Sequence, residues 1–294
     1  MTHSENKTKE KTQIFGIFGH PITHTLSPPM QNAAFEACNL NSVYIPMEIY
    51  PAFLKDAVAS VLPLGIKGLN VTIPHKETII PFLDSIDEES KKIGAVNTIE
   101  VSSGRLIGHN TDGRGYVASL SALNIGLADK RVIMIGAGGA AKGIAVTILS
   151  SGVTELIIMV RHRDRGQTLA KQLTTLFPDI KISVVGMDAK RRRFQKKNRA
   201  TLLINCTPLG MKQDDPSPFP FSWIEADWTV SDLVYRPAET PLLSAAKEVG
   251  ALTVSGIGML LHQGALAFEI WTRKKPPLSV MKDALENALS SLDT

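Results

Sequence analysis

Short apolar segments alternate with amphipathic segments along most of the chain. Apolar residues that follow one another directly, or occupy every second position, predict strands. Segments whose apolar residues recur at a period of about 3.6 predict helices. In the first half, the pattern predicts strand 14–18, helix 28–38, strand 43–49, helix 51–61, strand 68–72, helix 75–82 and strands 95–101 and 105–108. This alternation is typical of α/β proteins.

The second half begins near Asp129 and shows a more regular βαβ order. Its first strand, RVIMI at 131–135, is a continuous apolar run, as expected for a strand that is buried on both faces. The pattern then predicts a helix ending at 149, strand 155–160, helix 166–177, strands 180–185, 201–205 and 229–234, helix 240–249, strand 251–254 and helices 259–273 and 278–292, with a proline-rich loop at 214–222. Such a series predicts a Rossmann-type, doubly wound parallel sheet.

We therefore predict an α/β protein with two domains, which a length of 294 residues accommodates. Residues 13–113 would form a substrate-binding catalytic domain, and residues 114–256 a dinucleotide-binding Rossmann domain. The C-terminal helices, within 257–294, are expected to return to the first domain.

Composition narrows the class of protein. With 44% hydrophobic and 20% charged residues, the chain has the profile of a soluble globular protein. No apolar run approaches the roughly 18 residues of a membrane-spanning helix. The polar, lysine-rich residues 1–12 do not resemble a secretory signal, and we expect them to form a disordered tail. Cys38 and Cys206 lack metal-ligand spacing, so we expect two buried thiols and a cytoplasmic location.

The net charge of +4 arises from one segment. Residues 190–199, KRRRFQKKNR, contain seven of the 32 Lys and Arg residues, and the rest of the chain is slightly acidic. We interpret this segment as a solvated helix or loop. The alternative is a nucleic-acid patch, but Phe194 is the only aromatic residue in it, so we expect no nucleic-acid binding.

A glycine-rich turn, GAGGAA at 136–141, follows strand 131–135 directly and precedes a helix. It fits the pattern G-x-G-x-x-A. Gly136 would allow the tight turn, Gly138 would let the backbone approach a pyrophosphate, and Ala141 is small enough for close helix–strand packing. This context favours dinucleotide binding over a connector that binds nothing.

The end of the next strand indicates which dinucleotide binds. NAD enzymes usually place an acid there for the ribose hydroxyls. In this chain Val160 is followed by RHRDR at 161–165, and the bidentate, always charged guanidinium group suits a 2′-phosphate. We infer NADP rather than NAD. A solvated basic loop is the alternative, and Asp164 could still face a ribose.

Polar residues also gather at the expected strand ends of the first domain: Thr25, Ser27, Asn70, Thr72, Lys76, Asn97 and Asp112. Neither a metal-ligand cluster nor a nucleophile elbow is present. A carbonyl that accepts a hydride develops negative charge on its oxygen and needs a proton. A lysine oriented by a carboxylate can supply that proton, so Lys76 and Asp112 are a candidate catalytic pair. Taken separately, such residues are more often a surface lysine and a helix N-cap.

Eight segments, taken together and in order, resemble the shikimate dehydrogenase family. They are GHPITHTLSP (19–28), NVTIPHK (70–76), GAVNT (94–98), NTDG (110–113), GAGGAAKG (136–143), NCTPLGM (205–211), DLVY (232–235) and GIGMLLHQ (256–263). The resemblance extends from about residue 14 to residue 289. It implies the reversible, NADPH-dependent reduction of 3-dehydroshikimate to shikimate, a step toward aromatic amino acids, by an enzyme that is a monomer or a homodimer.

The resemblance also implies roles for individual residues. Lys76 and Asp112 would be the catalytic pair. Substrate would be bound by Thr25 and Ser27 through its carboxylate, by Thr72, Asn97 and Gln263 through its hydroxyls, and by Tyr235 nearby. Cofactor contacts are implied at Gly136, Ala137, Gly138, Gly139, Ala140, Arg161, Arg165, Thr207, Met211, Leu233, Gly256 and Met259.

Three positions depart from the family pattern. Thr25 replaces the first loop serine, His20 replaces an asparagine, and Val160-Arg161-His162 stands where the family has N-R-[TS]. The last change leaves open a quinate/shikimate dehydrogenase that uses NAD or both cofactors. A regulatory protein that kept the fold and lost the chemistry is a further alternative, against which the presence of both Lys76 and Asp112 argues.

Overall fold

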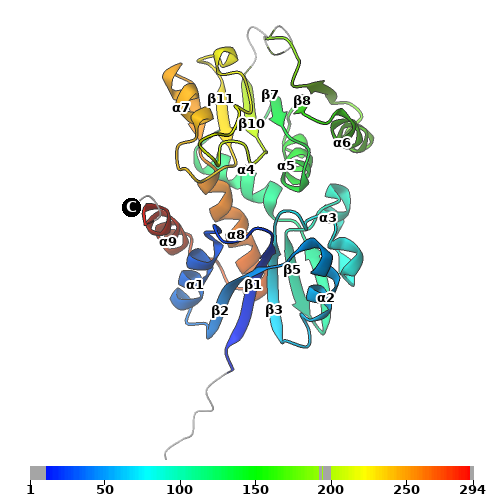
Figure 1. Ribbon diagram of the computed structural model, residues 1–294, viewed down its shortest axis with the longest axis vertical. Coiled ribbons are helices and arrows are strands. Elements are labelled where there is room, and N and C mark those ends of the chain that lie inside the picture. Colours follow the sequence, from blue (N-terminus) through cyan, green and yellow to red (C-terminus); the bar gives the residue numbers. More distant parts are fainter. Residues whose placement is uncertain (1–10, 192–193, 195–199, 292–294) are drawn as a thin grey trace, which may run out of the picture.

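The computed structural model describes residues 11–191, 194 and 200–291. Two six-stranded sheets lie one beyond the other along the long axis of the molecule, and each is flanked by helices (Figure 1). The predicted α/β architecture with two parts is confirmed. The domain limits 13–113 and 114–256 remain a prediction.

The first sheet is mixed. Its strands are β1 (Gln13–Gly19), β2 (Ser42–Glu48), β3 (Ile66–Val71), β4 (Ser85–Ile86), β5 (Thr98–Ser102) and β6 (Arg105–His109), in the order β2-β1-β3-β5-β6-β4. β1 pairs in parallel with β2 and β3, whereas β5 is antiparallel to both of its neighbours. In that antiparallel pair Thr98 lies opposite His109. The residue before β5 and the residue after β6 are therefore neighbours at one end of the sheet.

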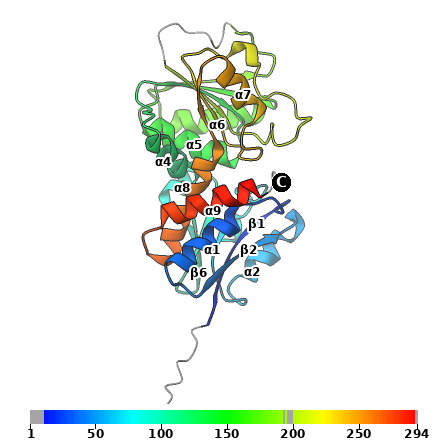
Figure 2. The ribbon, with the colours of Figure 1, turned by 90° about the vertical axis from the view of Figure 1, so that its left-hand side faces the viewer.

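The C-terminal helices pack against this first sheet. The helices in this half are α1 (Ser27–Ala37), α2 (Leu54–Ala59), α3 (Glu88–Ile93), α8 (Gly256–Thr272) and α9 (Leu278–Ser290). Figure 2 shows α9 beside α1. Phe15, Phe35, Phe268 and Met281 share one apolar core, so the last helices cover a sheet that the first residues begin.

The second sheet is parallel throughout. Its strands are β7 (Arg131–Ile135), β8 (Glu155–Val160), β9 (Lys181–Gly186), β10 (Thr201–Asn205), β11 (Thr229–Asp232) and β12 (Leu252–Val254), in the order β12-β11-β10-β7-β8-β9. The helices α5 (Gly139–Ser150), α6 (Arg163–Leu176) and α7 (Pro241–Glu248) accompany it. The strand order reverses between β7 and β10, and at such a point parallel sheets bind their ligands.

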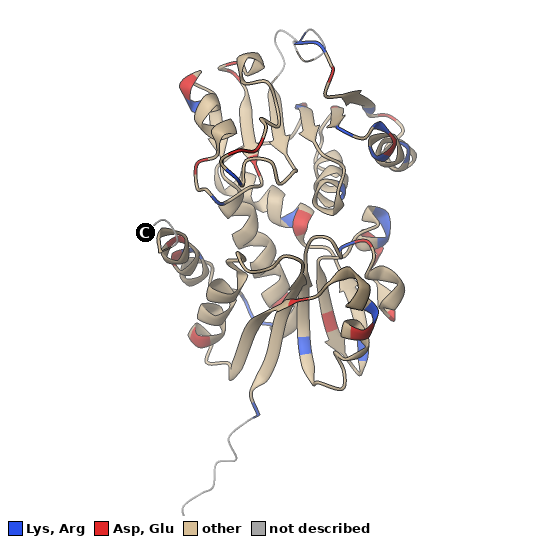
Figure 3. Cartoon of the chain, in the orientation of Figure 1, with Lys and Arg blue, Asp and Glu red and all other residues tan. Residues whose placement is uncertain are grey.

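The charged residues of this second sheet stand at the ends of its strands. β7, β8 and β10 are buried along their whole length, and the charged residues that they carry stand at strand ends (Figure 3). A continuous apolar run can be buried on both faces, which is why this half was predicted accurately.

Helix α4 (Asp112–Ala122) connects the two sheets and packs on α5 and α8. A Cβ atom added to Gly115 would lie 2.5 Å from the main-chain nitrogen of Gln263, so α4 and α8 meet backbone to backbone. This close approach brings Gln263 to the helix that begins with Asp112.

Three predictions about local structure were wrong. Residues 75–82 form turns and a short 3₁₀ helix, Ile80–Phe82, because Pro81 lacks an N–H group and restricts the residue before it. Helix α3 was missed although Asp87 caps it, accepting a hydrogen bond from the Ser90 N–H at 2.7 Å. Helix α4 was missed because Gly113 and Gly115 weaken its helical pattern.

Other expectations have mixed outcomes. Cys38 and Cys206 are free cysteines. Cys38 is only half-buried, so the expected burial of its thiol was wrong, whereas burial raises the pKa of the Cys206 thiol, as expected for a buried group. In the described part of the chain, no helix has the length and apolar character needed to cross a membrane. Most of the basic segment 190–199 and of the tail 1–12 lies outside the described residues. Phe194 is described and is buried against Phe219 and Trp223, so this aromatic side chain is not on the surface.

Candidate active site

The structure brings Lys76 and Asp112 together although 36 positions separate them in sequence. Lys76 lies in the turn that follows β3, and Asp112 is the first residue of α4. The Lys76 Nζ lies 2.5 Å from Asp112 Oδ2, and the two side chains are only 13% and 4% exposed. An ammonium group has three donors, so Lys76 keeps hydrogens that it can direct toward a bound molecule.

Asn97 fixes the carboxylate of Asp112. Its Nδ2 donates to Asp112 Oδ1 at 2.8 Å and to Thr111 Oγ1 at 2.9 Å, and its Oδ1 accepts from the Thr111 N–H at 2.8 Å. The pairing of β5 with β6 explains this proximity, because Asn97 precedes β5 and Thr111 follows β6. Both carboxylate oxygens of Asp112 therefore have a donor, one from each of two strand ends.

Asn70 belongs to the same network. Its Oδ1 accepts from the Tyr44 hydroxyl at 2.8 Å, and its Nδ2 donates to the Asn97 carbonyl at 3.2 Å and to Thr98 Oγ1 at 3.1 Å. Burial raises the pKa of Tyr44 well above its ordinary value, so this hydroxyl stays a donor. Asn70 thus supports Asn97, a role that its place at a strand end did not reveal.

The loop 20–28 lies at the same end of the first sheet. Thr25 is half-buried, and its Oγ1 accepts a hydrogen bond from the N–H of Ser27 at 3.3 Å. Ser27 is buried and begins α1, whose N-cap makes no side-chain hydrogen bond. Thr72 follows β3, and its N–H donates to the Phe18 carbonyl at 2.9 Å. The hydroxyl-bearing residues predicted for substrate thus flank the ends of β1 and β3.

Two residues reach this region from the second half of the chain. Gln263 of α8 is 9% exposed, and its Oε1 accepts a hydrogen bond from Asn97 Nδ2 at 3.4 Å. Tyr235 follows β11, and burial raises the pKa of its phenol, although a hydrogen bond from the Leu26 backbone opposes the increase. Gln263 therefore lies beside Asn97, and Tyr235 lies beside loop 20–28.

The glycine turn of the second sheet lies directly against Lys76. Gly136 has φ +105°, a conformation that favours glycine. A Cβ atom on Gly138 would meet nothing within 4 Å, whereas one on Gly139 would lie 3.0 Å from the Lys76 Cβ. Helix α5 begins at Gly139 with no side-chain cap. Its first N–H groups are consequently available to a phosphate next to the candidate catalytic pair.

The remaining predicted cofactor residues differ in their burial and in how closely they approach this turn. Ala137 and Ala140 are half-buried within it, and the Thr207 γ-methyl would lie 3.1 Å from a Cβ on Gly136. Gly256 approaches Leu233 so closely that a Cβ would meet the Leu233 carbonyl oxygen at 2.3 Å. Met211 is 50% exposed, whereas Met259 is buried in the core around α5.

The end of β8 carries the basic residues predicted for a 2′-phosphate. Arg161, His162, Arg163 and Arg165 are all exposed. The Nε of Arg161 donates to His162 Nε2 at 3.1 Å, while Arg163 pairs with Asp188 at 2.7 Å. That hydrogen bond lowers the pKa of Asp188. Arg163 is thereby engaged with a carboxylate, and Arg161 is the better placed guanidinium for an anion.

The sequence did not single out Asp232, which is buried at the end of β11. Its Oδ1 accepts from Asn205 Nδ2 at 2.9 Å, and its Oδ2 accepts from Thr240 Oγ1 at 2.7 Å. Burial raises the pKa of this carboxyl, against the effect of these hydrogen bonds. Asp232 joins the loops that follow β10 and β11, and the motifs NCTPLGM and DLVY were the signal that could have revealed it.

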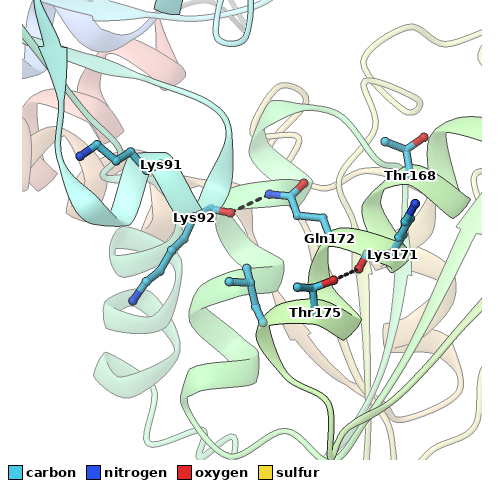
Figure 4. A pocket seen from close by; sticks show the side chains of 7 residues that line it. Lys91, Lys92, Thr168, Lys171, Gln172 and Thr175 are labelled. Atoms are coloured by element: carbon cyan, nitrogen blue, oxygen red, sulfur yellow. Dashed lines mark hydrogen bonds between the residues drawn. The ribbon is translucent and has the colours of Figure 1, made fainter.

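Helices α5 and α6 of the second half also make contacts with the first half. Lys142 of α5 pairs with Glu77 at 2.6 Å. Gln172 of α6 donates to the main-chain oxygens of Lys92 and Ile93, at 2.6 and 3.2 Å. The second contact borders a groove between α3 and α6 (Figure 4), which is lined by Lys91, Lys92, Thr168, Lys171, Gln172, Thr175 and Leu176. In the described residues, no group of three or more side chains is arranged to hold a metal ion.

Three family profiles match the chain. Their descriptions are "Shikimate dehydrogenase substrate binding domain" for residues 17–99, "Shikimate / quinate 5-dehydrogenase" for residues 119–188 and "Shikimate 5'-dehydrogenase C-terminal domain" for residues 256–286. A curated relative from Symbiobacterium thermophilum, named shikimate dehydrogenase (NADP(+)), is 40% identical over 98% of this chain and 99% of its own length.

Solved structures agree over nearly the full length. A shikimate dehydrogenase crystallised with NADP+ is 38% identical, with a TM-score of 0.86 over 95% of this chain and 96% of its own. A 5-ketofructose reductase from Gluconobacter is 32% identical, with a TM-score of 0.83 over 95% of this chain and 99% of its own.

Proposed function

Because the chain belongs to the shikimate dehydrogenase family, we propose that it catalyses the reversible, NADP-dependent reduction of 3-dehydroshikimate to shikimate. One observation carries this proposal beyond the family assignment. The ion pair between Lys76 and Asp112 is buried at the point where the glycine turn of the second sheet touches the first. A proton donor and a dinucleotide site thus lie side by side, as a carbonyl reductase requires.

The residues present fit NADP. The free space at Gly138 and the uncapped start of α5 suit a pyrophosphate, and the exposed Arg161 after β8 suits a 2′-phosphate. We assign the remaining predicted cofactor residues to the same site. They are Gly136, Ala137, Gly139, Ala140, Arg165, Thr207, Met211, Leu233, Gly256 and Met259. When bound, NADPH supplies the hydride for the carbonyl carbon.

Lys76 handles the proton. In the direction of reduction, its Nζ donates a proton to the carbonyl oxygen as negative charge develops there, and in oxidation the neutral amine takes a proton from the hydroxyl. Asp112 holds the ammonium in place, and Asn97 holds Asp112. Since these side chains are mostly buried, little water competes for the proton.

The polar groups around this pair suit a polyhydroxylated acid. We assign Thr25 and Ser27 to its carboxylate and Thr72, Asn97, Gln263 and Tyr235 to its hydroxyls. A cytoplasmic location and a monomeric or homodimeric state are also part of the proposal. The alternative, oxidation of quinate with NAD, is less well supported because β8 ends without a carboxylate.

One spectrophotometric comparison tests the function. Shikimate or quinate is combined with NADP or NAD, and the appearance of reduced nicotinamide gives kcat/KM for each pair. We expect the highest value for shikimate with NADP. A higher value for quinate with NAD would establish the alternative, and the absence of turnover with all four pairs would overturn the proposal.

A further inference from the structure

Two contacts bring the segment after β11 alongside loop 20–28. The Leu26 backbone makes a hydrogen bond with the Tyr235 phenol, and the guanidinium Nη1 of Arg236 lies 3.3 Å from His24 Nδ1. Residues 235–236 thus run beside residues 24–26. Arg236 thereby contacts the residue that precedes Thr25 in the loop, and we assign Thr25 to the substrate carboxylate.

Most of the hydrogen-bonding capacity of Arg236 is unused. A guanidinium group has five N–H donors and no acceptor, so His24 Nδ1 must accept in this contact. Among the described residues, His24 is the only hydrogen-bond partner of this guanidinium, and no carboxylate pairs with it. Arg236 is half-buried, whereas His24 and the contact between the two side chains are exposed. The charge of Arg236 also acts on the Tyr235 phenol, whose pKa it lowers against the effect of burial. A positive charge is therefore held, uncompensated, at the edge of the site.

The other groups on this side do not supply a free positive charge. Thr25 and Ser27 offer neutral hydroxyls, and the charge of Lys76 is balanced by Asp112. The fold itself does not select an acid, because a 5-ketofructose reductase shares it, and ketofructose is a sugar without a carboxylate. Discrimination between acid and neutral substrates must come from particular side chains.

We propose that Arg236 is a specificity-determining residue, which recognises the negative charge of the substrate carboxylate above Thr25 and Ser27. The proposal rests on the proposed function and adds the substrate property that this residue reads. Arginine suits the task because its fork matches a carboxylate and stays charged at every relevant pH. His24 holds the guanidinium beside the loop.

The test compares shikimate with its methyl ester, which has the same ring and no charge. Both are assayed with NADP, the ester as a substrate or as a competitive inhibitor, so that a binding constant is obtained in either case. In R236N we expect the preference for shikimate over the ester to fall roughly tenfold or more, the scale of one charge-assisted hydrogen bond. The loss should appear in KM for shikimate, with kcat nearly unchanged. R236K should retain most of the preference, because it keeps the charge.

A matched control is R105N, which removes an exposed arginine at the start of β6. This variant should change neither the KM for shikimate nor the binding constant of the ester. If R236N bound shikimate and its ester more weakly by the same factor, Arg236 would only shape the loop, and the inference would be overturned. An unchanged preference would overturn it as well. A wild-type enzyme that does not oxidise shikimate would instead overturn the proposed function, and this inference with it.

Discussion

On the side of the first sheet, the polar groups around the catalytic pair are mostly buried and bonded to one another, whereas the groups on the second sheet that we assign to the phosphates of the cofactor are half-buried or exposed. Asn97 alone contacts Asp112, Thr111 and Gln263. By contrast, Gly138 is exposed, and so is Arg161. The first side is organised before any ligand arrives, while the second consists of backbone and flexible side chains.

This difference shows how the site divides its tasks. Proton transfer needs atoms that are held in place, and a buried network provides that at the cost of strict dependence on each member. Binding of a phosphate needs mainly charge and free N–H groups, which exposed residues can supply. Substitutions on the first side should therefore alter turnover or stability, and substitutions on the second side should alter affinity.

The largest effect is expected for Lys76→Ala. Removal of the proton donor should lower kcat on the order of 10²- to 10⁴-fold, while the Kd for NADP changes little. Stopped assays give kcat, and fluorescence titration gives the Kd. Lys67→Ala, which removes an exposed lysine from β3, is the control and should keep full turnover. Comparable kcat values for the two variants would contradict the role of Lys76.

A smaller effect, on the opposite side of the comparison, is expected for Arg161→Ala. Loss of a charged partner of the 2′-phosphate should raise the Kd for NADP roughly 10- to 100-fold and leave the Kd for NAD unchanged. The melting temperature should stay the same, because the side chain is exposed. Calorimetric titration and thermal denaturation measure the two quantities. If the variant lost affinity for NADP and NAD equally, Arg161 would not contact the 2′-phosphate.

The smallest expected effect is a pH dependence of the folding stability, and it arises in the first half of the chain alone. His75 is buried beside Lys76, and one ring nitrogen lies 2.7 Å from the Ile49 carbonyl oxygen. Burial lowers the pKa of His75 below its ordinary value of 6.5, although that hydrogen bond opposes the decrease. Below pH 6.5, His75 therefore binds a proton more readily in the unfolded chain than in the folded chain. Stability should be complete above pH 6.5 and decline as the pH falls below that value.

Melting temperatures of the ligand-free protein between pH 5 and pH 7 measure this decline. It should be shallower in His75→Gln than in the wild type. His162→Gln, which replaces an exposed histidine, should follow the wild type. Parallel curves for all three proteins would show that His75 does not contribute.

The same contrast explains what the sequence could and could not reveal. RVIMI and the glycine turn are local signals, and both elements were predicted correctly because strand burial and turn chemistry depend on adjacent residues. The strand-end residues of the first half also gather at one end of their sheet, but only partly through parallel pairing. Asn97 is brought there by the antiparallel pairing of β5 with β6, which the sequence reasoning did not include.

Contacts between distant residues were inaccessible to this reasoning. The distance between Lys76 and Asp112, and the hydrogen bond from Asn97 to Gln263, depend on helix packing across 36 and 166 positions. Asp232 was missed because its partners, Asn205 and Thr240, lie 27 and 8 positions away, at the end of β10 and at the N-cap of α7. Only resemblance to a family pointed to Gln263 in advance.

Because α8 and α9 complete the core beneath β1, the part of the protein that is synthesised first depends on the part that is synthesised last. During translation the nascent first sheet lacks Phe268 and Met281 until the closing helices leave the ribosome. The core of the second sheet also takes Met259 from α8, but the strands of this sheet follow one another in sequence and can pair earlier. A transcript cut short before α8 would accordingly yield a nucleotide-binding half joined to an unfinished partner, which is a natural target for proteolysis.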